Sequence, residues 1–114
     1  MSTHDFPLNV IVSVVKNRLV APWEDYRDFL DHVTGQHIPL WDVERARRFV
    51  AARLLAQNKE LRQLPDPPEK TDSGNAAKYV RDCAKKCRYD HLPVSTSKSK
   101  YVVRTSAQAL KENG

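Results

Sequence analysis

The sequence has 114 residues, of which 40% are apolar and 29% are charged, a balance that fits one folded domain and excludes a disordered chain. Its apolar runs are far shorter than the roughly 18 residues that cross a bilayer, and residues 1–8 lack the basic segment that opens a secretory signal. Cys83 and Cys87 are the only cysteines and lie four residues apart, a spacing that favours a reduced pair. We therefore expect a cytoplasmic protein without a membrane segment.

The positive charge of the chain is concentrated in its C-terminal part. Residues 1–67 hold nine basic and nine acidic residues, whereas residues 68–114 hold ten basic and five acidic ones, so the whole net charge of +5 lies in this second part. Such segregation is typical of a module that binds a polyanion. A solvated, lysine-rich surface produces the same excess, so charge alone leaves both interpretations open.

Two helices are predicted in the first 35 residues. Leu8 to Val20 is rich in β-branched residues and has partial helical periodicity, which favours a helix weakly. The next segment begins with Pro22, continues with acidic residues and stops at Gly35. Pro in the first turn, early acids and a terminal Gly are the signals of a helix, and this one is amphipathic.

A third and longest helix is predicted from about Pro39 to Leu64. Its buried side should carry a stripe at three- and four-residue steps, made of Val43, Ala46, Val50, Leu54, Gln57, Leu61 and Leu64. This stripe is longer than one small core requires, so we expect that a homodimer is possible.

Residues 65–75 are Pro-rich and lack apolar periodicity, which predicts a linker or an exposed loop. A fourth helix should follow from Asn75 to about Arg88. At 100° per residue, one face of this helix collects its apolar residues, namely Ala76, Tyr79, Val80, Cys83 and Cys87. The opposite face collects cations, namely Lys78, Arg81, Lys85 and Arg88. The pattern predicts a helix anchored by one side that presents a basic stripe on the other.

A β-hairpin is predicted beyond this helix. Apolar runs at Leu92–Val94 and Tyr101–Val103 flank a polar turn that carries Lys98 and Lys100, and Ser106 can cap a short last helix. The expected fold class is mainly α with a small β-hairpin. The expected organisation is a helical core region at residues 1–64, the Pro-rich segment at 65–75, and a basic helix, hairpin and terminal helix at 76–114 that pack on the same core.

Residues 76–112 resemble the C-terminal half of winged helix-turn-helix modules, which are common among phage and bacterial regulators. In those modules a basic recognition helix precedes a Pro-containing wing strand, a Ser-rich turn and an aromatic residue that opens the second strand. Pro93, Ser95–Ser99 and Tyr101 take these places here, and Lys100 stands where such sequences often have Gly. The match covers about 35 residues.

Residues 8–64 have a looser resemblance to a family of small, uncharacterised tailed-phage proteins. It rests on a TG turn and a His-containing Leu-Pro entry to the next helix, formed by Thr34, Gly35, His37, Pro39 and Leu40. The resemblance implies a phage or prophage origin, and hence the cytoplasm of a host cell. It implies no chemistry.

The winged-helix resemblance implies a protein that binds double-stranded DNA and regulates transcription or replication. Its implied contacts are the helix residues Lys78, Arg81, Lys85 and Arg88 together with the wing residues Lys98, Lys100 and Arg104. The alternative is a phage-encoded inhibitor that docks on a host protein, either a defence system such as CRISPR or the transcription machinery. It would use the same basic face, against an acidic partner, or the acidic helix from Trp23 to Val33. A structural or assembly protein is the third interpretation.

The sequence contains no arrangement typical of an enzyme or a cofactor site. Its four histidines are scattered without a Ser/His/Asp, HExxH or paired-carboxylate pattern, and its three glycines cannot form a phosphate-binding loop. Cys83, Cys87 and His91 have a spacing that could supply three zinc ligands, but no convincing fourth ligand accompanies them. We therefore expect no enzyme, no metal and no cofactor.

Overall fold

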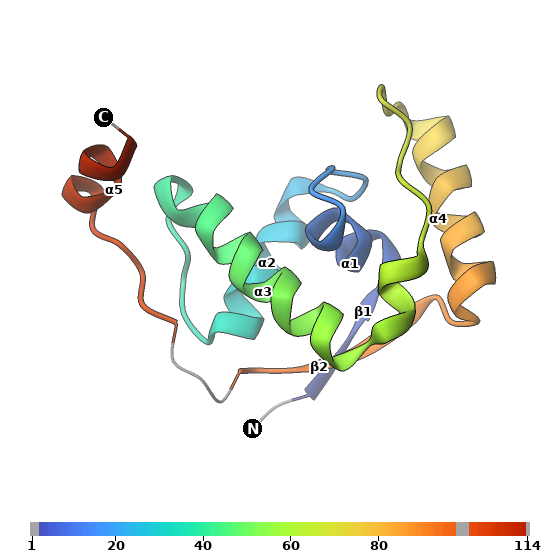
Figure 1. Cartoon of the computed structure of the whole chain (residues 1–114), viewed down its shortest axis with the longest axis horizontal. Helices are drawn as coiled ribbons and strands as arrows, with labels where there is room; N and C mark the ends of the chain where they lie inside the picture. The colour runs from blue at the N-terminus through green and yellow to red at the C-terminus, as the bar shows by residue number, and fades with distance from the viewer. Residues whose placement is uncertain (1–2, 98–100, 114) are drawn as a thin grey trace.

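A computed structural model describes residues 3–97 and 101–113 of the chain. Over these residues it is mainly helical with one two-stranded antiparallel sheet, which confirms the predicted fold class (Figure 1). The elements are β1 (Thr3–Pro7), α1 (Leu8–Val15), α2 (Trp23–Thr34), the 3-10 turn η1 (Leu40–Asp42), α3 (Val43–Gln57), the 3-10 turn η2 (Lys59–Gln63), α4 (Ser73–Cys87), β2 (His91–Ser95) and α5 (Ser106–Asn113).

Helix α1 lies at the centre of the core. Val10, Ile11, Val12 and Val14 are all buried, as expected for a helix that is apolar on every side. The helix ends at Val15, earlier than predicted, because the chain folds back: the Ser13 hydroxyl donates to Asn9 O over 2.7 Å and accepts from the Val20 N–H over 3.0 Å. The last five residues of the predicted helix, 16–20, therefore belong to a loop.

Helix α2 begins and ends close to the predicted residues. Phe29, Leu30 and Val33 face the core. Gly35 ends the helix in the left-handed region, with φ of 74°, and its N–H donates to Asp31 O over 2.9 Å. This is the C-terminal glycine cap that the sequence predicts.

The predicted third helix forms, but Asn58 divides it. The Asn58 backbone leaves the helical region, and its side-chain amide donates to Leu54 O over 3.2 Å, so the chain continues as the 3-10 turn η2. Most of the predicted stripe is buried within this chain, with Ala46, Val50, Leu54, Leu61 and Leu64 in the core and Gln57 exposed. The stripe therefore gives no reason to expect a homodimer.

The predicted strand at residues 92–94 forms, but its partner was predicted wrongly. β2 pairs with the N-terminal strand β1, with Phe6 opposite Leu92 and His4 opposite Val94. Residues 101–105 form no strand. The Tyr101 ring instead packs on Phe49 at 5.0 Å between ring centroids, which directs this segment toward α3. Lys98 and Lys100 of the predicted turn lie outside the described residues.

Residues 65–72 form a loop that packs on neighbouring elements. Tyr79 Oη on α4 donates to Pro65 O over 2.6 Å, and Lys16 pairs with Asp66 at 3.2 Å. Tyr79, Cys83, Leu92, Val94 and Tyr101 join the same core as α1, α2 and α3. The C-terminal part therefore packs on the core of the N-terminal part. Across the described ranges, the structure contains no helix of the length and apolarity that a membrane span requires.

Candidate nucleic-acid interface

The start of α4 is fixed by a reciprocal pair of side-chain hydrogen bonds. Asp72 Oδ1 accepts from the Asn75 N–H over 2.8 Å, and Asn75 Oδ1 accepts from the Asp72 N–H over 2.7 Å. This capping box satisfies two of the four N–H groups that a helix start leaves without partners. It fixes the residue at which α4 begins.

The inner face of α4 holds the helix on the core. Tyr79 and Cys83 are buried, and Val80 and Cys87 are half-buried. Both cysteines are free thiols, and burial raises the pKa of each above that of an ordinary thiol. The thiol, and not the nucleophilic thiolate, therefore predominates at neutral pH, so this face serves packing.

The outer face of α4 carries the four predicted helix cations. Within the described part of the chain, no hydrogen bond or ion pair engages their charged groups, and all four side chains are exposed: Lys78, Arg81, Lys85 and Arg88. Neighbours three and four apart on a helix lie about 5–6 Å apart at Cβ, and a rise of about 1.5 Å per residue makes the row about 15 Å long. We call these four residues the basic row.

Of the four arginines of α3, Arg45 and Arg47 are engaged within the protein, whereas Arg48 is exposed. Arg47 forms a bidentate pair with Glu44, with a shortest distance of 2.8 Å, and also donates to Val14 O over 3.0 Å. Arg45 donates to Val102 O over 2.6 Å. The partners of these cations lie within the protein, which distinguishes them from the basic row.

Two further charged residues flank the basic row. Asp82 is the one acidic residue of α4 and is exposed, so its negative charge lowers the potential beside the row. Lys86 is also exposed, although our helical projection did not place it on the basic face. Its position next to Lys85 was the available signal, since a long lysine side chain extends beyond the angle of its Cα.

Arg88 ends α4 in an unusual backbone conformation. Its φ of 66° lies in the left-handed region, and its N–H donates to Ala84 O over 2.8 Å. Glycine is the usual residue at this position, because a residue with Cβ is strained there. The chain therefore keeps a cation at the end of the basic row at some expense in stability.

Arg104, predicted as a wing contact, does not extend the basic row. Its Nε donates to Asp42 Oδ1 over 2.6 Å, its Nη2 donates to Trp41 O over 2.8 Å, and its side chain is only 12% exposed. Burial raises the pKa of Asp42, but hydrogen bonds from Tyr101 and Arg104 outweigh it and hold this pKa below its usual value. Arg104 thus neutralises a buried carboxylate, which explains why it is not free for DNA.

The described ranges hold no group of three or more His, Cys, Asp or Glu placed to bind a metal ion. Cys83, Cys87 and His91 therefore do not converge. Comparisons of the chain with protein-family models, curated proteins and solved structures found no match. Function must accordingly be argued from the geometry of this surface.

Proposed function

We propose that the outer face of α4 binds the phosphate backbone of double-stranded DNA. The observation that carries this proposal is the basic row, in which four exposed cations share one helix face and lack partners within the described part of the chain. Cations that neutralise phosphates release condensed counterions, and this release supplies much of the affinity for DNA. Since these four cations are not paired with acidic residues in the described part of the chain, they are available to pair with phosphates.

The position of α4 suits this role. The helix forms one end of the molecule, with its inner side toward α1 (Figure 1). A helix with its side chains is about 10–12 Å across, which matches a major groove of about 12 Å. Lys78 and Lys85 would contact phosphates, while Arg81 offers the planar group that pairs with guanine. Because residues 101–105 form no second wing strand, the role in regulating phage transcription or replication rests on the resemblance of the basic helix to a winged-helix recognition helix.

The proposal is tested by titrating the labelled protein with a short duplex and following backbone amide resonances. Binding by the basic row predicts that the largest shifts fall on α4, with smaller changes on α3. Asp82→Asn removes the one acidic charge of this helix and should tighten binding several-fold. Shifts centred elsewhere, or an unchanged affinity in Asp82→Asn, would contradict the proposal.

A second candidate function, binding to a host protein, rests on an exposed apolar surface formed by residues of the N-terminal half of the chain. Leu19, Trp23 and Leu40 line one shallow hollow and are 44%, 43% and 66% exposed. Trp is a typical anchor of protein interfaces, and exposed apolar side chains that lie together mark interaction sites. This surface favours the alternative of a phage-encoded inhibitor that docks on a host protein.

The two candidates are separated by matched variants. Trp23→Ala with Leu40→Ser should abolish capture of a host protein and leave duplex binding unchanged if the apolar hollow is the functional surface. Alanine substitutions in the basic row should abolish duplex binding and leave capture of a host protein unchanged if DNA is the partner. Affinity capture from host lysate and a duplex-binding assay on the parent and both variants give both readouts.

A further inference from the structure

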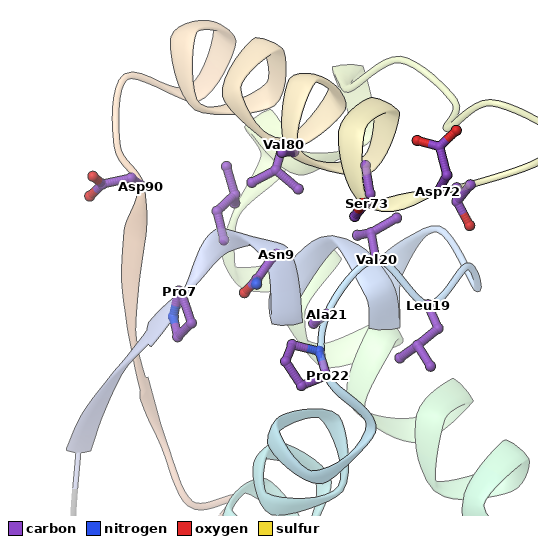
Figure 2. Close-up of a pocket in the computed structure, with 14 residues that line it drawn as sticks. Pro7, Asn9, Leu19, Val20, Ala21, Pro22, Asp72, Ser73, Val80 and Asp90 are labelled. Atoms are coloured by element: carbon purple, nitrogen blue, oxygen red, sulfur yellow. The ribbon is translucent and has the colours of Figure 1, made fainter.

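A pocket of about 630 Å³ lies on the inner side of α4, away from the basic row. It is bounded by the start of α1, by residues 19–22 and by the N-terminal half of α4 (Figure 2). Its wall is mostly apolar and includes Leu8, Leu19, Val20, Ala76, Ala77 and Val80. The volume falls within the roughly 300–1,000 Å³ typical of small-molecule sites.

Asn9 places an unsatisfied polar atom in this wall. Of the side-chain nitrogens and oxygens that the structure describes as buried, Asn9 Oδ1 is the one without a hydrogen-bond partner. Buried acceptors are rarely left unpaired, because their desolvation is then uncompensated. In Figure 2 Asn9 lies among the lining residues, between Pro7 and Ala21 in this view. Since the terminal amide torsion of Asn has a broad minimum, a small rotation can turn Oδ1 toward a bound donor.

The charges around the pocket select against anions. Asp72 and Asp90 are the charged residues that line it, and they stand at opposite ends in Figure 2. Among the residues that the structure describes, the lining contains no Lys, Arg or His. The two charged side chains that line the pocket are therefore negative, which favours a neutral or cationic ligand over an anion.

We infer that this pocket binds a small, largely apolar molecule that carries an N–H donor and no negative charge. The apolar body would lie between α1 and α4, and the N–H would donate to Asn9 Oδ1. The inference is independent of the basic row, because none of its four residues lines the pocket.

The test uses the full chain, labelled with ¹⁵N, and three probes that share an indole ring: tryptamine, indole-3-acetamide and indole-3-acetate. We expect tryptamine and indole-3-acetamide to cause saturable amide shifts on both walls, at residues 19–22 and at the start of α4. The acetate should bind at least tenfold more weakly. No saturable shifts at these walls, or equal binding of the acetate, would overturn the inference.

Two variants identify the site. Asn9→Leu should weaken indole-3-acetamide binding about tenfold, because the acceptor is lost. Ala77→Phe places a ring at the mouth of the pocket from an exposed helix position and should abolish binding of tryptamine and indole-3-acetamide. Ala52→Phe, at an exposed position of α3 outside the pocket, is the matched control and should bind like the parent. If Asn9→Leu does not fold, Ala77→Phe decides alone, and unchanged affinity in it overturns the inference.

Discussion

Arg104 Nε donates a hydrogen bond over 2.6 Å to Asp42 Oδ1, a carboxylate with no exposed surface. Tyr101 Oη donates to the other oxygen of the same carboxylate, Oδ2, also over 2.6 Å. These contacts join the segment after residue 100 to the start of α3, which lies about 60 residues earlier in the chain. The C-terminal segment is thus held by a buried charge pair and not by a strand.

Removing the arginine of this pair should destabilise the fold strongly. Arg104→Ala removes the nearer of the two cations that pair with the buried Asp42 and leaves Arg45 at 3.6 Å, and breaking a buried pair costs about 3–5 kcal/mol. Urea unfolding followed by circular dichroism measures the loss. Arg48→Ala, which removes an exposed arginine from α3, is the matched control and should change the unfolding free energy by less than about 0.5 kcal/mol. Equal effects of the two substitutions would contradict the role of the pair.

The same carboxylate should make the protein sensitive to acid. Because the folded-state pKa of Asp42 lies below its usual value, the ionised form contributes stability that is complete above about pH 4–5. This contribution is lost as the pH falls below about 4 and the folded-state carboxylate takes up a proton. Asp42→Asn should be less stable at pH 7 and should lose less stability than the parent between pH 7 and pH 3. A parallel pH dependence in both proteins would contradict this prediction.

The fold was predictable where the signals are local. Helix α2 has Pro22, early acids and Gly35, and α4 has an amphipathic pattern, so both were predicted within a few residues. The sheet was not predictable in its pairing, because β1 and β2 are separated by more than 80 residues and Thr3–Pro7 carries no apolar alternation. The aromatic Tyr101 resembled the start of a strand, but its hydroxyl has a buried carboxylate as partner.

In the candidate site, too, the features with a local sequence signal were predictable and those that depend on distant contacts were not. The basic row follows from helical geometry alone, so the sequence was sufficient to place Lys78, Arg81 and Lys85 together. Arg104 was predicted as a DNA contact of the wing because the sequence does not show that it pairs with Asp42, which looks like an ordinary acidic residue at a helix start. The pocket beside Asn9 is formed by the start of α1, residues 19–22 and the N-terminal half of α4, which meet only in the folded chain. No local sequence pattern therefore predicts it.

Arg88 offers a way to separate stability from binding. Arg88→Gly relieves the left-handed strain at the end of α4 and should stabilise the protein by about 1 kcal/mol. The same substitution removes one cation from the basic row, so it should weaken duplex binding. Thermal unfolding and fluorescence anisotropy on one preparation test both effects. A stabilised variant with parental DNA affinity would exclude Arg88 from the interface.

The tyrosines of the folded protein should ionise at a higher pH than free tyrosine does. Burial is the main cause that raises the pKa of all four, Tyr26, Tyr79, Tyr89 and Tyr101, and it raises Tyr101 to about 12 with help from the Asp42 carboxylate. A raised folded-state pKa means that stability is retained below about pH 10 and falls as the pH rises above it. Absorbance at about 295 nm should therefore show little phenolate near pH 10 in the native protein and half-ionisation in urea. A native phenolate that forms at its ordinary pKa would contradict this prediction.

The salt dependence of duplex binding tests the basic row most directly. Three phosphate contacts, from Lys78, Lys85 and Arg88, predict that log K falls against log salt with a slope of about −2.7, and Lys78→Ala with Arg81→Ala and Lys85→Ala should reduce it to about −0.9. The control replaces Arg48, Lys59 and Lys111, three exposed cations outside α4, with alanine and causes the same change in net charge. We predict that the control keeps the parental slope. Equal slopes in both triple variants, or no saturable binding by the parent, would contradict DNA binding by α4.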